Sequence, residues 1–224
     1  MLGGNRQNVS RRRVAVIGLG RFGSSVARVA HELGYDVTAI DISEERVAEA
    51  ADYATLAAQA DGADEAALRS LGVDRSEVAV VGQGQHIEDS VSCALILKRI
   101  GVPWVIAKAK TALHGEILTK VGADRIVYPE QEAGVQVAHS LLIRHLVTYM
   151  NLSDTSGVAK MGVPATVVGQ SIGEIEAARP HMCIILVQRG NLLLTRPALE
   201  TALLEGDVVL VAGLDEAIDA FADS

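Results

Sequence analysis

Short apolar runs alternate with amphipathic segments through the first part of the chain. The apolar runs predict strands at 14–17, 37–40, 54–58, 77–81, 104–107 and 124–127. Segments with apolar positions three and four residues apart predict helices at 21–33, 43–50, 63–71, 86–100 and 111–121. Because crossovers between parallel strands are right-handed, this alternation predicts an α/β fold. The expected form is a Rossmann-like, doubly wound parallel sheet with helices on both faces and a ligand at its carboxyl edge.

A long helical pattern follows at 130–150, with apolar residues on more than one side. Such a helix either covers only its own sheet or also packs on a second chain, and the pattern leaves both readings open. The polar segment after it contains glycine and serine, which is typical of a linker.

The remainder of the chain changes character. Strands are predicted at 158–161, 165–168, 182–188, 192–194 and 208–211, and helices at 171–178 and 214–222. Gly190-Asn191 fits a hairpin turn, so we expect a small α+β lobe with antiparallel pairs. The predicted organisation is a basic leader at 1–12, a Rossmann-like domain at 13–150, a linker at 151–156 and a C-terminal domain at 157–224.

A glycine pattern links the first predicted strand to the first helix. Gly18 makes the turn, Gly20 lets the backbone approach a pyrophosphate, and Gly23 lets the helix pack closely on the strand. Free amide groups at that helix start face an anion. Asp41 ends the second strand near the spacing at which a carboxylate reaches ribose hydroxyls. This context favours an adenine-nucleotide site over a glycine turn that only packs.

Other residues at the same predicted edge extend the candidate site. Arg21 could fork onto phosphate oxygens. Lys108 could neutralise phosphate or reach solvent, and Asp61 either borders the adenine or belongs to a simple turn. The full set of candidate nucleotide-binding residues is Gly18, Gly20, Arg21, Phe22, Gly23, Asp41, Ile42, Asp61, Gly82 and Lys108.

Candidate metal and catalytic residues are few. Glu130 begins the long helix, where a carboxylate either complements the helix dipole or, in a dimer, joins nucleotide phosphates around a divalent cation such as Mg²⁺. The six histidines show no metal-ligand spacing, and no catalytic group is indicated. We therefore expect a protein that is not an enzyme.

Charge and composition restrict the partners. The net charge of −8 repels phosphate backbones and anionic membrane surfaces, and the arginines before residue 14 are better explained as a solvated leader than as a nucleic-acid arm. Cys93 and Cys183 lie in apolar surroundings and are expected to be buried free thiols in a reducing compartment. No apolar stretch is long enough to span a membrane, so we expect a cytoplasmic protein without direct membrane insertion.

Five segments together resemble a known family. They are VIGLGRFGSSVA at 16–27, AIDISEERV at 39–47, VGADRIVYPE at 121–130, RPHMCIILVQRGNLLL at 179–194 and EGDVVLVAG at 205–213. Over nearly its whole length the chain resembles the cytosolic regulatory subunits of bacterial Ktr and Trk potassium-uptake systems, which are built from RCK domains. Its single-unit length is similar to the Ktr type.

This resemblance implies a nucleotide-sensing gating subunit. It implies ATP, ADP or NAD(H) in the first lobe, a crossover helix that joins homodimers, and a homo-octameric ring under a membrane-embedded potassium channel subunit at the inner face of the membrane. By the same resemblance, the three glycines and Arg21 hold phosphates, Asp41 holds the ribose, and Glu130 holds a divalent cation at the dimer interface. Similar places in the C-terminal lobe imply a cyclic di-AMP site at Arg179, Ile184, Ile185 and Arg189.

Two alternatives use the same residues differently. The chain could be an NAD(H)-binding redox sensor or an NAD-dependent oxidoreductase, and in both cases Asp41 would disfavour the 2′-phosphate of NADP by charge repulsion. Residues 157–224 hardly supply the second substrate site that hydride transfer needs. A third alternative, nucleic-acid regulation, rests on the basic leader alone.

Overall fold

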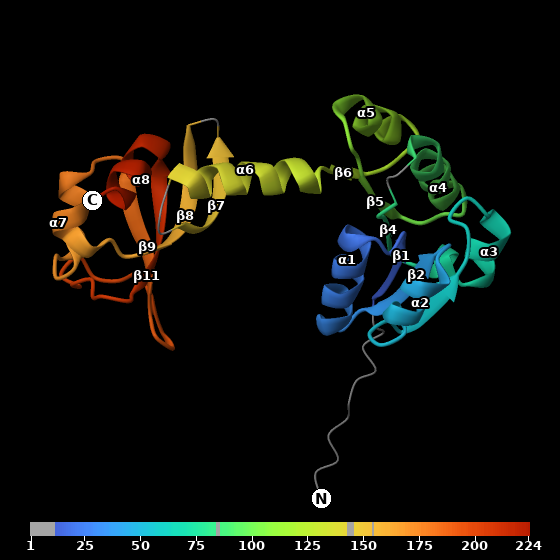
Figure 1. The fold of residues 1–224 in the computed structure, drawn as a ribbon, viewed down its shortest axis with the longest axis horizontal. Coiled ribbons are helices and arrows are strands. Elements are labelled where there is room, and N and C mark those ends of the chain that lie inside the picture. Colours follow the sequence, from blue (N-terminus) through green and yellow to red (C-terminus); the bar gives the residue numbers. More distant parts are fainter. Residues whose placement is uncertain (1–11, 84–85, 143–145, 154) are drawn as a thin grey trace, which may run out of the picture. The chain divides into compact units, whose positions relative to one another are not determined.

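The computed structural model describes residues 12–83, 86–142, 146–153 and 155–224 of the chain (Figure 1). The chain forms two compact units, residues 1–130 and 131–224. This division lies at the start of the long predicted helix, whereas the sequence pattern placed the domain boundary at residue 150. The predicted basic leader lies almost entirely outside the described residues.

The first unit is the predicted doubly wound parallel sheet. Its strands are β1 (Arg13–Ile17), β2 (Asp36–Asp41), β3 (Leu56–Gln59), β4 (Val78–Val81), β5 (Trp104–Lys108) and β6 (Arg125–Val127). Its helices are α1 (Arg21–Glu32), α2 (Glu44–Ala50), α3 (Glu65–Ser70), the short 3₁₀ helix η1 (Val73–Arg75), α4 (Ile87–Arg99) and α5 (Ala112–Lys120). The strand order is β3-β2-β1-β4-β5-β6, so the winding direction reverses between β1 and β4. Ligands bind open parallel sheets at such a switch point.

Strand β1 shows why this sheet is covered on both faces. Ala15 and Ile17 belong to a core cluster with residues of α3, α4 and α5. Val14 and Val16 belong to a second cluster with residues of α1 and α2. Successive side chains of a strand point to opposite faces, so an uninterrupted apolar strand must be covered on both faces of the sheet.

The long helix is shorter than the sequence pattern predicted. Helix α6 (Pro129–Leu142) ends eight residues before the predicted end, and strand β7 (Leu146–Ser153) follows. Leu146 and Tyr149 fit the spacing of a helical stripe, but antiparallel pairing of β7 with β8 (Ser156–Gly162) decides the conformation. Residues 131–138 of this helix are all exposed. A helix that covered its own sheet would bury some of them, and none is buried.

The second unit is the predicted α+β lobe. All five strands of its sheet pair antiparallel, in the order β10-β9-β11-β8-β7. The remaining elements are β9 (Met182–Arg189), β10 (Leu192–Thr195), β11 (Val208–Leu214), α7 (Ile172–Ala178), α8 (Asp215–Ala222) and the 3₁₀ helix η2 (Ala165–Val167). The hairpin at Gly190-Asn191 is confirmed, because Leu192 pairs with Arg189. The strand predicted at 165–168 is wrong: Pro164 begins a single 3₁₀ turn instead.

The predicted linker is largely a hairpin between β7 and β8. Residues 151–153 end β7 and Ser156 begins β8. The glycine that suggested a linker has a packing role, because a Cβ atom on Gly157 would lie 2.1 Å from the hydroxyl oxygen of Tyr149. Tyr149 is buried, and its hydroxyl donates a hydrogen bond to Asp215 at the start of α8. Burial, with the Asp215 carboxylate beside it, raises the pKa of the Tyr149 phenol.

The two cysteines differ from the expectation that both are buried. Cys93 is buried in the core of the first unit, and this burial raises the pKa of its thiol. Cys183 is exposed, because it lies on β9 between the buried Met182 and Ile184 and therefore points to the opposite face of the strand.

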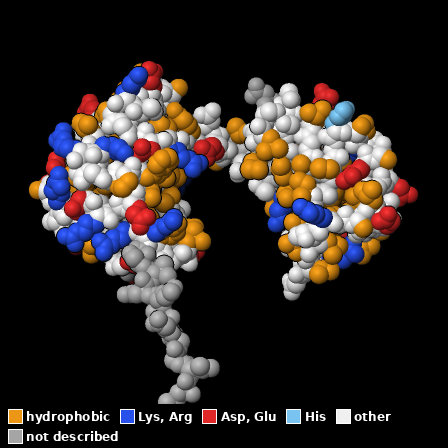
Figure 2. All heavy atoms as spheres, turned by 180° about the vertical axis from the view of Figure 1, so that it is seen from behind, with side chains coloured by type: hydrophobic (Ala, Val, Ile, Leu, Met, Phe, Trp, Pro, Cys, Tyr) orange, Lys and Arg blue, Asp and Glu red, His pale blue; other side chains and the backbone are white. Residues whose placement is uncertain are grey.

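Exposed apolar side chains gather on one face of the second unit (Figure 2). Large exposed hydrophobic residues on its strands are Val147, Met150, Leu152, Ile185, Leu192, Leu193 and Leu214. None of the helices in the described ranges has both the length and the apolar character needed to cross a membrane.

We expect Gly157→Ala to destabilise the second unit by about 1–3 kcal/mol, because the added methyl group meets the Tyr149 ring. Calorimetric unfolding of the full chain measures this. Gly134→Ala is the control, since a Cβ atom there meets no atom within 4 Å. In a Tyr149→Ala background, adding Gly157→Ala should cost almost nothing. Wild-type stability of the Gly157→Ala variant would contradict the packing role.

Candidate functional site

A cavity of about 460 Å³ opens at the carboxyl edge of the parallel sheet, within the first unit. This volume is in the range of small-molecule sites. It lies where the winding direction of the sheet reverses, between β1 and β4. The predicted site residues that line it are Gly18, Gly20, Arg21, Phe22, Asp41, Ile42, Gly82, Lys108 and Glu130. Residues far apart in the sequence are thus brought to one hollow.

Two predicted residues do not line the cavity. Gly23 is buried, and a Cβ atom there would lie 1.9 Å from the carbonyl oxygen of Gly18, so its role is close packing of α1 on β1. The carboxylate of Asp61 accepts a hydrogen bond from the amide of Ala63 at 2.8 Å, as in a simple turn. Its neighbour Gly62 lines the cavity instead.

The glycines of this turn are present for two different reasons, close packing within the fold and access from the cavity. Gly18 has φ +92°, and a Cβ atom there would lie 2.4 Å from the amide nitrogen of Gln83. The folded chain itself therefore requires Gly18 and Gly23. At Gly20, by contrast, a Cβ atom would meet nothing within 4 Å, although Gly20 lines the cavity. The backbone at Gly20 is open to close approach from the cavity side.

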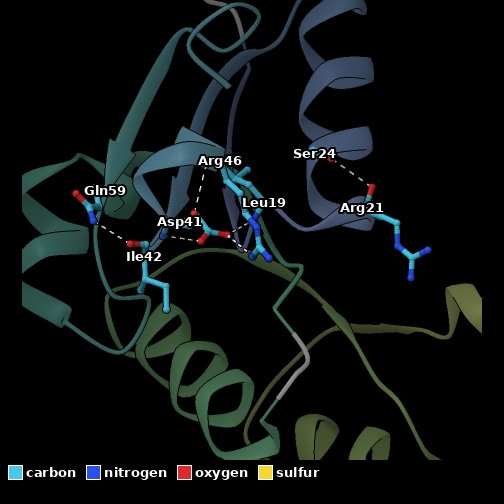
Figure 3. Close-up of polar contacts among 8 residues, drawn as sticks. Leu19, Arg21, Ser24, Asp41, Ile42, Arg46 and Gln59 are labelled. Carbon is cyan, nitrogen blue, oxygen red and sulfur yellow. Dashed lines mark hydrogen bonds and ion pairs between the residues drawn. The ribbon is translucent and has the colours of Figure 1, made fainter. Parts of the chain in front are cut away.

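The start of α1 is suited to an anion. Gly20 is the residue before the helix, no side chain caps the helix, and its first turn contains no acidic residue. Amide groups of a first helical turn have no partners within the helix. The Arg21 side chain extends away from Asp41 (Figure 3), so positive charge lies on the side of the turn opposite that carboxylate.

The Asp41 carboxylate lies on the other side of the glycine turn from Arg21 and accepts two backbone hydrogen bonds. One carboxylate oxygen accepts the amide of Leu19 at 2.6 Å, and the other accepts the amide of Ser43 at 2.9 Å (Figure 3). The guanidinium of Arg46 lies 3.4 Å from the first oxygen. A carboxylate has about four lone-pair sites, so Asp41 keeps acceptor capacity toward the cavity. Ser43 caps α2 as predicted, through the amide of Arg46.

Ile42 supplies apolar surface next to this carboxylate. Ile42 is 68% exposed and lines the cavity, while its carbonyl accepts a hydrogen bond from the Gln59 side chain at 2.9 Å. The backbone is thus fixed and the side chain faces the open space, as the flat face of an aromatic base would require.

An ion pair lies where β5 and α6 meet the cavity. The ammonium of Lys108 lies 2.6 Å from the carboxylate of Glu130. This hydrogen bond, aided by the charge of Arg21, holds the pKa of Glu130 below its usual value. The described residues contain no cluster of three or more His, Cys, Asp or Glu side chains that could hold a metal ion. Glu130 alone therefore makes no cation site, and Mg²⁺ would need phosphate oxygens or a further carboxylate.

Sequence reasoning missed several cavity residues. Arg46, Gln83, His86, Asp89 and Lys110 also line the cavity. A usable signal existed, because each follows a parallel strand directly or lies at the start of the helix after it, and the carboxyl ends of these strands share one edge. The spacing alone does not predict what these five side chains would contact in the cavity.

A buried histidine supports the loop that carries Lys110. The amide of Lys110 donates to Nδ1 of His114 at 3.3 Å, so Nε2 carries the proton and donates to Ser90 at 2.8 Å. Burial, with a smaller effect from the Lys110 charge, lowers the pKa of His114. This ring does not line the cavity, and its role is to join α4 to α5.

The four candidate residues of the C-terminal lobe have different surroundings. Arg189 makes two hydrogen bonds to Asp207, at 2.9 and 2.7 Å, and Ile184 is buried. Arg179 lies over the ring of Phe221, at 5.7 Å from its centre. Ile185 is exposed. Three of the four thus have structural surroundings within this lobe.

Comparison with known proteins identifies both units. Residues 14–129 match the TrkA-N domain family, and residues 159–224 match the TrkA-C domain family. The chain is 35% identical to the Ktr system potassium uptake protein A of Bacillus subtilis (strain 168), over 95% of this chain and 96% of that protein.

Solved structures share the fold. The crystal structure of the GsuK RCK domain matches 97% of this chain with a TM-score of 0.65 and 19% identity, and this chain covers 49% of it. The GsuK channel bound to NAD matches 96% of this chain with a TM-score of 0.63 and 19% identity, and this chain covers 40% of it. Since both domain families match in order and a Ktr protein aligns over nearly its whole length, the chain belongs to the TrkA-N/TrkA-C family of KtrA-like RCK proteins.

Proposed function

We propose that this chain is the regulatory subunit of a Ktr-type potassium-uptake system and that an adenine nucleotide binds in the glycine-turn cavity. One observation carries the proposal: Gly20 lines the cavity at an uncapped helix start, and no atom of the described residues lies within 4 Å of where its Cβ would be, so close packing does not require a glycine there. A pyrophosphate against that backbone accounts for it. The relative at 35% identity is a potassium uptake protein, which supplies the physiological context.

The cavity orients the nucleotide. The pyrophosphate lies on the amides that start α1, the ribose reaches Asp41, and the base lies against Ile42. Arg21 and Lys108 then neutralise the outer phosphates, since both line the cavity on the Glu130 side. A triphosphate gains more from these two cations than a monophosphate does, so the site distinguishes ATP from shorter nucleotides.

The Lys108–Glu130 ion pair couples the cavity to α6. Glu130 is the second residue of α6 and the last residue of the first unit. A phosphate that attracts Lys108 weakens its bond to Glu130, and the start of α6 then changes its electrostatic surroundings. A gating subunit needs such a difference between two nucleotide states, and it needs no chemical reaction. We therefore propose a protein that is not an enzyme.

Exposed apolar surface supports a proposal that the chain assembles with further copies of itself. Val135 and Val137 of α6 are 38% and 59% exposed, and the second unit exposes the apolar strand residues named above. Large exposed apolar surfaces mark interaction sites. We propose a homodimer through α6, assembly of dimers into an octameric ring, and docking of this ring on a membrane potassium-conducting subunit at the cytoplasmic face.

A divalent cation fits this proposal only together with phosphate. Glu130 would supply one carboxylate and the nucleotide would supply phosphate oxygens, which is the donor set that Mg²⁺ uses in many nucleotide sites. Cyclic di-AMP has less support, because Arg189 is held by Asp207 and Ile184 is buried.

NAD(H) is the second candidate ligand, favoured by one observation. Asp41 ends β2, as does the carboxylate that binds ribose in NAD sites, and the GsuK channel, which shares this fold, has been solved bound to NAD. Competition between ATP and NADH on the purified chain decides between an ATP-type sensor and a redox sensor.

We expect Gly20→Ala to weaken ATP binding roughly tenfold or more, because the methyl group occupies the approach to the pyrophosphate. The free energy of unfolding should change by no more than about 1 kcal/mol, the cost of alanine at a helix start. Calorimetric titration measures the affinity. Gly134→Ala, which also adds a methyl group in open space, should bind ATP as wild type does. Unchanged ATP affinity in Gly20→Ala would refute the proposed approach.

We expect Arg21→Ala to weaken ATP binding roughly tenfold to a hundredfold, the loss of a charge-assisted hydrogen bond, while 5′-AMP loses much less. The same titration with both nucleotides measures the difference. Arg28→Ala is the matched control, because Arg28 lies on the same helix and covers Tyr53 instead of the cavity. Equal losses for ATP and 5′-AMP would place the phosphates elsewhere.

We expect Glu130→Gln to have opposite effects on ATP binding with and without Mg²⁺. Without Mg²⁺, loss of the partner of Lys108 frees that ammonium for phosphate, and affinity rises a few-fold. With Mg²⁺, the variant loses the gain that the cation gives the wild type. Titrations of ATP in both conditions test this, with Glu132→Gln as the control on the same helix. A Mg²⁺ effect of wild-type size in Glu130→Gln removes Glu130 from the cation site.

A further inference from the structure

Arg46 is a cavity residue that the proposed function does not yet use. It is the third residue of α2, and its half-exposed side chain turns back toward the end of β2 (Figure 3). Its guanidinium lies 3.4 Å from the Asp41 carboxylate, and both residues line the cavity. A cation therefore lies beside the carboxylate that was expected to exclude a 2′-phosphate.

Asp41 does not depend on Arg46 for its position. Two backbone amides, those of Leu19 and Ser43, hold its two oxygens at 2.6 and 2.9 Å. The contact with Arg46 is longer, and the Arg46 side chain is 47% exposed. The Asp41 side chain is only 4% exposed, but its two amide hydrogen bonds remain when the half-exposed guanidinium moves, so the carboxylate is not left without partners. Asp41 then stays in place and accepts a ribose hydroxyl.

Once the Arg46 guanidinium has left Asp41, it lies at the ribose end of the cavity, where it can bind a phosphate on the ribose 2′-oxygen. In dinucleotide folds, an acidic residue after the second strand favours a free 2′-hydroxyl, whereas a nearby arginine accommodates a 2′-phosphate. The arginine fork matches two phosphate oxygens and forms charge-assisted hydrogen bonds to both. In this chain the acidic residue and the arginine are both present, five residues apart in the sequence, at the end of β2 and in the first turn of α2.

We propose that the cavity accepts adenine nucleotides that carry a phosphate on the ribose 2′-oxygen, and that Arg46 binds this phosphate. The inference rests on the proposed function, because it needs an adenine nucleotide with its ribose at Asp41. It broadens the class of ligand from nucleotides with a free ribose, such as ATP and NAD(H), to 2′-phosphorylated ones, such as NADP(H). Repulsion by Asp41 is offset by Arg46.

Calorimetric titration of the full chain with 5′-AMP and adenosine 2′,5′-bisphosphate tests the inference, because these ligands differ only in the 2′-phosphate. The wild type should bind the bisphosphate at least as tightly as 5′-AMP. Arg46→Ala should weaken the bisphosphate roughly tenfold or more and 5′-AMP less than about threefold. Arg46→Lys keeps the charge without the fork and should fall between them. Arg69→Ala removes an arginine paired with Glu65 on α3 and should change neither affinity.

Two outcomes overturn the inference while the proposed function stands. One is a wild type that binds 5′-AMP and ATP but binds the bisphosphate more than about tenfold more weakly. The other is an Arg46→Ala variant that weakens both ligands equally, which would make Arg46 a purely structural partner of Asp41. Failure of the wild type to bind 5′-AMP, ATP or NADH would overturn the proposed function as well.

Discussion

Close packing of backbone around the Gly18 peptide is the constraint on which the rest of the structure depends. Cβ atoms on Gly23 and Gly82 would lie 1.9 and 2.6 Å from the same carbonyl oxygen, that of Gly18. The Gly18 amide donates to the carbonyl of Ile40, and the Gly82 amide donates to that of Ile17. The backbone of Ile17 and Gly18 thereby joins β1, β2, β4 and α1. The cavity exists because these elements meet without side chains between them.

This packing also explains which parts of the site were predictable. The glycines and Asp41 act through backbone geometry that recurs at a fixed spacing, so their positions could be read from the sequence. The Lys108–Glu130 ion pair depends on which side chains of distant elements meet at one edge. Strand order brings them together, and a single sequence contains no direct signal of strand order.

Two of the errors in the fold share one physical cause. At 146–149 the helical spacing of apolar residues was real, yet pairing with β8 and burial of Tyr149 outweigh local pattern. Gly157 looked like a linker residue for the same reason, because the ring that requires a glycine there lies across the hairpin. Long, continuously apolar strands were predicted correctly, since their burial on both faces leaves no alternative conformation.

The central claim is that nucleotide in the glycine-turn cavity controls potassium flux through a membrane partner. The most direct measurement is potassium uptake into proteoliposomes that contain the membrane subunit accompanying this chain, with the full chain added in the presence of ATP, ADP or no nucleotide. The account predicts fluxes that differ between ATP and ADP, and loss of this difference with Gly20→Ala. Equal fluxes with ATP, with ADP and without nucleotide would contradict it, provided that the chain is shown to bind both nucleotides under these conditions.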